Sequence, residues 1–346
     1  MSEHIHRITE AVLKGSWDDI RADATAWVRE LEIKGQKDPR PYFALNVVHL
    51  LHGEFKEAWK THAASLEAAE DIEQVRTWVD ALLKDHPDRA NVHLVGGLFL
   101  SQSGRSEESV ARYKEAARLN PRSAYPHYFL AQIHERAGRP EMAIKAYREA
   151  IKLNPAFAPA RTNLGVAYQD QGQIEMAIPQ YREVLKLNPD DAVAHANLAC
   201  ALGEQGKVEA AIVEYKEAIR LNARDAEVHF SLGGLYETKG RLDLALIEYE
   251  EALKANPNFG PAETAIGWIR LNKGWRDEAL ESFGRALKSN PEDAKAYLGI
   301  ARVYLMKGKQ QTAMDNYALA LKHEKDPEKK SKIMNDLFRE GNTWDV

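Results

Sequence analysis

The sequence predicts an all-α fold, a solenoid in which helix–turn–helix units of equal length stack on one another. Three residue types recur every 34 residues along most of the 346-residue chain, which is the signature of a repeat array. Glycine recurs without a gap at Gly104, Gly138, Gly172, Gly206, Gly240, Gly274 and Gly308. An aromatic ring recurs at Tyr113, Tyr147, Tyr181, Tyr215, Tyr249, Phe283 and Tyr317. Proline recurs at Pro87, Pro121, Pro155, Pro189, Pro257 and Pro291, with Ala223 at the one missing place.

Each copy is expected to form two helices, and the copy at 158–191 shows why. In its first half Leu164 and Tyr168 are four residues apart, so they lie on one helical face. Gly172 then ends the first helix, because glycine adopts a left-handed backbone without steric cost. The second half carries Tyr181 on its apolar face, and Pro189 blocks continuation of that helix. The pattern therefore predicts a succession of paired helices.

A small residue at the eighth place of each copy completes the pattern, at Gly97, Ala131, Gly165, Ala199, Gly233, Gly267 and Ala301. Together these positions resemble the tetratricopeptide repeat (TPR) family, whose hallmark is a 34-residue helix–turn–helix unit. The copies are set at 90–123, 124–157, 158–191, 192–225, 226–259, 260–293 and 294–327, so that residues 90–327 form seven repeats. The resemblance implies a right-handed superhelix whose first helices line a concave groove.

The N-terminal residues 1–89 are expected to form degenerate, acidic TPR-like helical repeats. This quarter of the chain accounts for the whole formal net charge of −5. The spacing of Gly53 and Ala58 predicts a degenerate copy at about 39–72, and residues 9–33 predict an amphipathic helix pair around Gly15. The repeat signal is weaker here because the small residues of the regular copies are missing.

Residues 328–346 are expected to form a C-terminal capping helix and tail. Ile333, Met334, Leu337 and Phe338 make one apolar seam on an otherwise charged helix. A solenoid needs such a cap because its last repeat would otherwise expose a hydrophobic face. The alternative is a docking helix for a partner.

The composition and motifs favour a non-enzymatic protein without a cofactor or metal. The sequence contains no glycine-rich phosphate loop, no Gly-x-Ser-x-Gly elbow and no His-Glu-x-x-His motif. The pairs His4–His6 and His49–His52 lack a third ligand nearby, and Cys200 is the only cysteine. The acidic balance argues against a nucleic-acid partner. The chain also lacks an 18-residue apolar run, so no membrane span is expected, and a cytoplasmic location is predicted.

The resemblance implies that positions two, five, six, nine, twelve and thirteen of each copy line the groove. Carried over to this sequence, several of these positions are apolar or aromatic, with Tyr125, Tyr128, Phe129, Phe230 and Trp268 as the candidate peptide-binding residues. Apolar side chains on that face suggest a surface that a partner covers. The alternative is that some of them face the neighbouring helix inside a tightly wound spiral.

Asn163 and Asn197 stand at the sixth position of consecutive copies. This arrangement is similar to the asparagine ladder of the TPR array of O-linked N-acetylglucosamine transferase, whose amides hydrogen-bond the backbone of an extended peptide. An amide offers both a donor and an acceptor to a peptide unit. The alternative is that the two asparagines only follow the family pattern. No lysine occupies position five of any copy, which argues against a receptor for chaperone tails.

These features predict a protein–protein interaction scaffold that binds an extended segment of a partner protein in its concave groove. Buried aromatic anchors would supply most of the affinity, and the amides would set the register. The alternative is a self-assembling structural protein, a homo-oligomer whose acidic N-terminal repeats dock on another copy.

Overall fold

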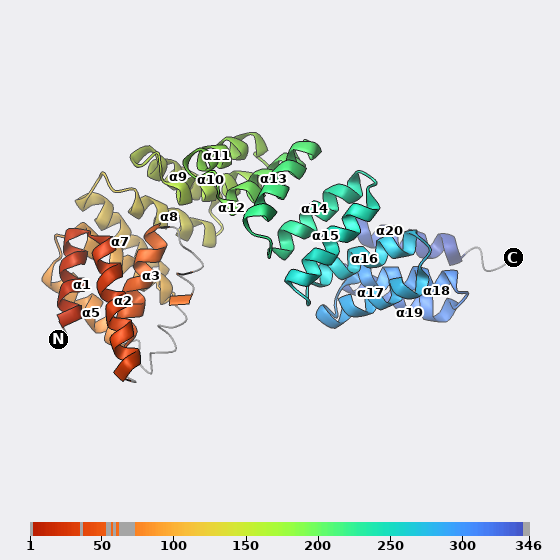
Figure 1. Cartoon of the computed structure of the whole chain (residues 1–346), viewed down its shortest axis with the longest axis horizontal. Coiled ribbons are helices and arrows are strands. Elements are labelled where there is room, and N and C mark those ends of the chain that lie inside the picture. Colours follow the sequence, from red (N-terminus) through yellow and green to blue (C-terminus); the bar gives the residue numbers. More distant parts are fainter. Residues whose placement is uncertain (1–2, 35–36, 53–56, 58–59, 62–72, 342–346) are drawn as a thin grey trace. The chain divides into compact units, whose positions relative to one another are not determined.

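The computed structural model describes residues 3–34, 37–52, 57, 60–61 and 73–341. All regular structure in these ranges is α-helical (Figure 1). The chain divides into two compact units, an N-terminal unit at Met1–Pro189 and a C-terminal unit at Asp190–Val346, and each is described by itself. The all-α prediction is therefore confirmed for the described residues. The division between the two units lies between Pro189 and Asp190. The domain boundaries expected at 89 and 327 therefore remain predictions.

The N-terminal unit contains ten described helices. They are α1 (Glu3–Lys14), α2 (Trp17–Lys34), α3 (Pro39–His52), α5 (Glu73–Asp85), α6 (Ala90–Gln102), α7 (Ser106–Leu119), α8 (Tyr125–Arg136), α9 (Pro140–Leu153), α10 (Ala158–Asp170) and α11 (Ile174–Leu187). The pair predicted around Gly15 is present as α1 and α2. The proposed copy at about 39–72 extends over 53–56, 58–59 and 62–72, which lie outside the described residues.

The C-terminal unit contains nine helices in its described part. They are α12 (Ala192–Glu204), α13 (Val208–Leu221), α14 (Ala226–Thr238), α15 (Leu242–Ala255), α16 (Gly260–Asn272), α17 (Arg276–Ser289), α18 (Ala294–Met306), α19 (Gln310–His323) and α20 (Pro327–Gly341). Each even-numbered helix from α12 to α18 packs closely along the helix that follows it. We call these even-numbered helices the first helices of their pairs.

The turn between α10 and α11 shows how the recurrent glycine ends a first helix. Gly172 has a φ of 68°, in the left-handed region that favours glycine. Its N–H donates to the Gln169 carbonyl at 2.8 Å, and the Gln173 N–H donates to the Tyr168 carbonyl at 2.8 Å. These two bonds satisfy carbonyls at the helix end, so the chain can reverse and begin α11.

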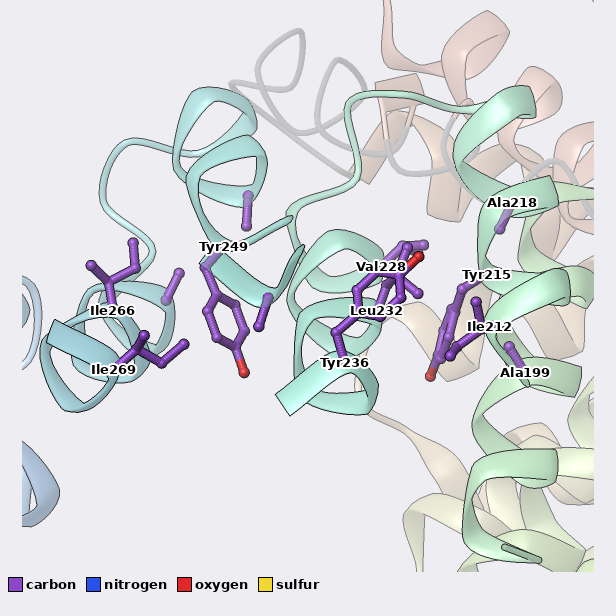
Figure 2. Packing of buried hydrophobic residues seen from close by; sticks show 13 residues of the cluster. Ala199, Ile212, Tyr215, Ala218, Val228, Leu232, Tyr236, Tyr249, Ile266 and Ile269 are labelled. Atoms are coloured by element: carbon purple, nitrogen blue, oxygen red, sulfur yellow. The ribbon is translucent and has the colours of Figure 1, made fainter. Parts of the chain in front are cut away.

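The recurrent aromatic ring fills the space between the helices of a pair and the next pair. Figure 2 shows Leu232 and Tyr236 of α14 between the rings of Tyr215 and Tyr249. A Cβ atom on Gly233 would lie 2.6 Å from the Tyr249 ring, which is closer than non-bonded carbon atoms approach one another in proteins. The small residue at position eight is therefore needed because the ring lies directly against the backbone of the first helix.

The N-terminal helices are held by a mixed aromatic and polar core. Ile5 and Ile8 of α1 are buried, as is Trp27 of α2. His4 stacks on Trp27 with ring centroids 5.9 Å apart and hydrogen-bonds the Glu30 carboxylate at 2.8 Å. His4 therefore has a packing role. Within the described ranges, no three side chains of histidine, cysteine, aspartate or glutamate gather closely enough to hold a metal ion.

Candidate functional site

Two of the candidate residues, Tyr128 and Phe129, lie in the core of the N-terminal unit and not on its surface. They are 0% and 3% exposed. The Phe129 ring stacks on Tyr113 of the preceding copy, with centroids 5.5 Å apart, so position six faces the neighbouring pair. Both rings pack inside the protein, and their assignment to the peptide-binding groove stays a prediction. Tyr125 is half-buried, and its ring packs nearly perpendicular to that of Phe157, with ring centroids 5.4 Å apart.

Asn163 also faces the preceding pair, and part of its hydrogen-bonding capacity is used inside the protein. Its Nδ2 donates to the Tyr147 hydroxyl at 3.3 Å. That hydroxyl donates in turn to Oε2 of Glu135 at 2.7 Å. The Asn163 amide therefore stabilises the seam between two copies, whatever else it contacts.

Position twelve has a structural role that the sequence analysis missed. Glu135 accepts the hydrogen bond of Tyr147, Gln169 accepts that of Tyr181 at 3.1 Å, and Glu237 accepts that of Tyr249 at 2.8 Å. Each acceptor stands twelve residues before its tyrosine. The signal was present in the sequence as a polar residue recurring at one fixed distance before a buried tyrosine, because a buried hydroxyl needs a partner.

The Glu135 carboxyl should make folding stability depend on pH. Burial raises the pKa of Glu135 above its usual value of 4.5, although the Tyr147 hydroxyl lowers it in part. The Glu135 carboxyl therefore stays protonated to a higher pH in the folded protein than in the unfolded chain. Folding stability accordingly falls as pH rises from the unfolded-state pKa through the folded-state pKa. We expect Glu135→Gln to be more stable relative to wild type at pH 7 than at pH 4. Urea unfolding at both pH values tests this, and an equal difference at both would contradict it.

Asn197 lines a pocket in the C-terminal unit, between α12, α13 and α14. Its volume is about 320 Å³, within the range of about 300–1,000 Å³ usual for ligand pockets. The lining residues are Ala192, Val193, Ala196, Asn197, Cys200, Tyr215, Ala218, Asn222, Asp225, Glu227, Val228 and Ser231. Val193, Ala196, Asn197 and Cys200 stand at positions two, five, six and nine of one copy, and Glu227 and Ser231 at positions two and six of the next. Positions that the family resemblance assigns to the groove in two consecutive copies thus line one hollow, which we call the Asn197 pocket.

The Asn197 pocket combines an apolar wall with polar groups. Val193 is 62% exposed at its rim, and Asn197 is half-buried. Tyr215 reaches the pocket from α13, and burial raises the pKa of its hydroxyl, which interacts with Ser231 and Cys200. Cys200 is exposed, and its thiol donates to Oε1 of Glu204 at 3.4 Å. The pocket can therefore receive an apolar side chain while amide and hydroxyl groups hydrogen-bond a peptide backbone.

The remaining two candidates in this unit are half-buried aromatic rings on first helices. Phe230 packs on Tyr249 and on Phe259, with both centroid distances 5.4 Å. Trp268 packs on Phe283 at 5.7 Å, and the Arg302 guanidinium lies 5.3 Å from its ring. Both rings serve packing on one side and retain partial exposure on the other. Asn163 and Asn197 belong to different units, so each is interpreted only within its own unit.

Comparison with known proteins identifies the repeats. Tetratricopeptide repeat models match residues 196–258 and 264–329 and also residues 158–191, and a TPR repeat model matches residues 137–172. No curated protein sequence matches the chain. Every helix in the described ranges is too short or too polar to cross a membrane.

Among solved structures, MamA is 31% identical over 48% of this chain and 97% of its own, with a TM-score of 0.44. PilF of Pseudomonas aeruginosa is 20% identical over 60% of this chain and 94% of its own, with a TM-score of 0.53. A tetratricopeptide repeat protein of Parabacteroides merdae is 14% identical over 71% of this chain and 97% of its own, with a TM-score of 0.57. The repeat models together match more than half of the chain, which therefore belongs to the tetratricopeptide repeat family.

Proposed function

We propose that the chain is a non-enzymatic scaffold whose C-terminal unit binds an extended segment of a partner protein across the Asn197 pocket. The observation that carries this proposal is the convergence of groove positions from α12 and α14 on one hollow. Val193 and Ala196 supply apolar contact, and Asn197 supplies a donor and an acceptor for a peptide unit. Such pockets favour a segment that presents alternate side chains to the protein and keeps its backbone within reach of polar groups.

Removing the Asn197 amide should weaken binding without unfolding the protein. Dodecapeptides selected from a random display library against the full-length protein serve as the probe. We expect Asn197→Ala to weaken the selected peptides about tenfold, because an unpaired peptide group in the pocket loses its hydrogen bond. Fluorescence anisotropy gives the dissociation constants, and circular dichroism should show an unchanged melting temperature.

Asn258→Ala is the matched control, since Asn258 is an exposed asparagine in the turn before α16. It removes the same amide from the same unit, outside the pocket. Equal binding by wild type, Asn197→Ala and Asn258→Ala would contradict the proposal. Asn163→Ala is less suitable as a binding test, because it also removes the hydrogen bond to Tyr147.

Self-assembly is a second candidate, favoured by exposed apolar side chains on second helices of the C-terminal unit. Val213 of α13 is 63% exposed, and Leu244 and Ile247 of α15 are 41% and 52% exposed. Val213 and Ile247 stand at the same position of consecutive copies, so a second copy of this chain could cover both. Light scattering over a range of protein concentrations separates the candidates. A mass that stays at 39.0 kDa throughout would remove this one.

A further inference from the structure

A second pocket of the C-terminal unit lies between α18 and α20 and has a volume of about 240 Å³. Its lining residues are Ala294, Lys295, Leu298, Arg302, Glu324, Lys329, Lys332, Ile333 and Asp336. On α18, Lys295, Leu298 and Arg302 stand at positions two, five and nine of the copy at 294–327. The same positions of α12 supply one wall of the Asn197 pocket. We call this second hollow the terminal pocket.

Helix α20 supplies the other wall in the register of a further repeat. If a next copy is counted from residue 328, Lys329, Lys332, Ile333 and Asp336 stand at positions two, five, six and nine. The family resemblance assigns these positions to the groove, and α14 presents two of them to the Asn197 pocket. Helix α20 therefore covers the last hydrophobic face and also completes a pocket of the same construction.

The lining of the terminal pocket includes two apolar side chains, Leu298 and Ile333, and one internal ion pair, Arg302 with Asp336. Ile333 is 5% exposed, and Leu298 is half-buried beside it. Arg302 donates to Oδ2 of Asp336 at 2.8 Å, and its guanidinium also lies over the Trp268 ring. The positive charge of Arg302 is thus balanced by Asp336, and the pair joins α18 to α20.

The terminal pocket carries surplus positive charge. Its lining has four basic residues, Lys295, Arg302, Lys329 and Lys332, and two acidic ones, Glu324 and Asp336. Lys295, Lys329 and Lys332 are exposed around it. Only Lys329 has an ion-pair partner among the described residues, Asp326 at 3.5 Å, whereas Lys295 and Lys332 have none in those ranges. By contrast, the charged lining residues of the Asn197 pocket, Asp225 and Glu227, are both acidic. The two pockets of this unit therefore differ in the charge they attract.

We propose that the terminal pocket binds an acidic side chain of the partner segment, with a neighbouring apolar residue of that segment on Leu298 and Ile333. This inference rests on the proposed peptide-binding function and specifies the chemistry of the peptide. A carboxylate between Lys295 and Lys332 gains two charge-assisted contacts, which are stronger than neutral hydrogen bonds. The Asn197 pocket would repel the same group, so the charge difference sets the direction in which the segment lies along the unit.

The test compares two variants of equal net charge. Lys295→Gln with Lys332→Gln removes the surplus charge of the terminal pocket. Lys288→Gln with Lys322→Gln removes two exposed lysines from the second helices α17 and α19. The probe is the same dodecapeptide library panned on each full-length protein, followed by anisotropy measurements on the selected peptides at about 50 and 300 mM salt.

We expect wild type and the Lys288/Lys322 variant to select peptides with Asp or Glu at a fixed position. The Lys295/Lys332 variant should lose that preference, bind the wild-type peptides about tenfold more weakly and show a reduced salt dependence. An acidic preference that survives in the Lys295/Lys332 variant, or that never occurs, overturns the inference. Peptide binding that still depends on Asn197 would then leave the proposed function standing. If no selected peptide depends on either pocket, both proposals fail.

Anionic polymers are the other class of ligand that a basic lining could attract. A thymidine dodecanucleotide is therefore added as competitor in the anisotropy measurement. We expect it not to displace the acidic peptide, because the apolar lining of Leu298 and Ile333 favours a peptide side chain. Displacement that disappears in the Lys295/Lys332 variant would assign the terminal pocket to nucleic acid and overturn the inference.

Discussion

Phe283→Ala is expected to lower the free energy of unfolding of the C-terminal unit by about 3–5 kcal/mol, the usual loss when a buried phenylalanine becomes alanine. The Phe283 ring is 0% exposed and packs on Trp268, with centroids 5.7 Å apart. The same ring lies against the backbone of both its own pair and the next one. Its loss therefore opens a cavity at the junction of two copies, where each copy depends on its neighbour for stability.

Urea unfolding of the full-length protein, followed by circular dichroism, measures the Phe283→Ala effect. Val213→Ala is the control because Val213 is 63% exposed on the same unit, and a surface substitution of this kind changes stability by less than about 0.5 kcal/mol. A loss for Phe283→Ala no larger than that of Val213→Ala would show that the recurrent ring is not the core of the repeat.

Gly299→Val is expected to destabilise the same junction by at least about 1–3 kcal/mol, through overpacking. A Cβ atom on Gly299 would lie 2.2 Å from the Phe283 ring, and one on Gly267 would lie 2.5 Å from it. The ring is thus held between two glycines of successive first helices. Neither helix can move away alone, because α16 and α18 also pack on one another.

Two further variants separate this close approach from a general effect of replacing glycine. Gly284→Ala, one residue from the ring, meets no neighbouring atom and should stabilise α17 by about 1 kcal/mol, as glycine is a poor helix former. In the Phe283→Ala background, Gly299→Val should cost much less than in wild type, because the atoms it would meet are gone. Urea unfolding of the four combinations gives the coupling, and additive effects would contradict the proposed contact.

The repeat period was enough to predict the helix pairs. It was not enough to predict which neighbouring helix each side chain contacts. Gly172 and Pro189 marked the ends of two helices that the structure places at Ala158–Asp170 and Ile174–Leu187. Periodicity identifies a helical face, but the angle between successive pairs decides what that face meets. Position six meets the ring of the preceding copy, so Phe129 stacks on Tyr113 and Asn163 bonds Tyr147.

The candidate site was predictable where groove positions remain accessible and not where large side chains fill the junction. Asn197 lines a pocket, whereas Tyr128 and Phe129 are buried. The positive charge of the terminal pocket could not be predicted from the sequence, because lysines on a C-terminal helix are typical of an ordinary solvent-exposed face. Only the register of α20 relative to α18 brings Lys332 and Lys295 to the same pocket.

Cys200 allows the most direct test that a peptide lies in the Asn197 pocket. It is the only cysteine of the chain, it is exposed, and it lines that pocket. A selected peptide is synthesised with one cysteine at each position in turn and equilibrated with the protein in a glutathione buffer, where a disulfide forms most readily between thiols held close together.

We predict that one or two adjacent peptide positions form the disulfide with Cys200 far more readily than the others, and that Asn197→Ala reduces this trapping. The matched control carries Cys200→Ser and Val213→Cys, which moves the thiol to the exposed side of α13. Trapping there should be weak and independent of the peptide position. Equal trapping at Cys200 and at the control cysteine would contradict binding of an extended segment in this pocket.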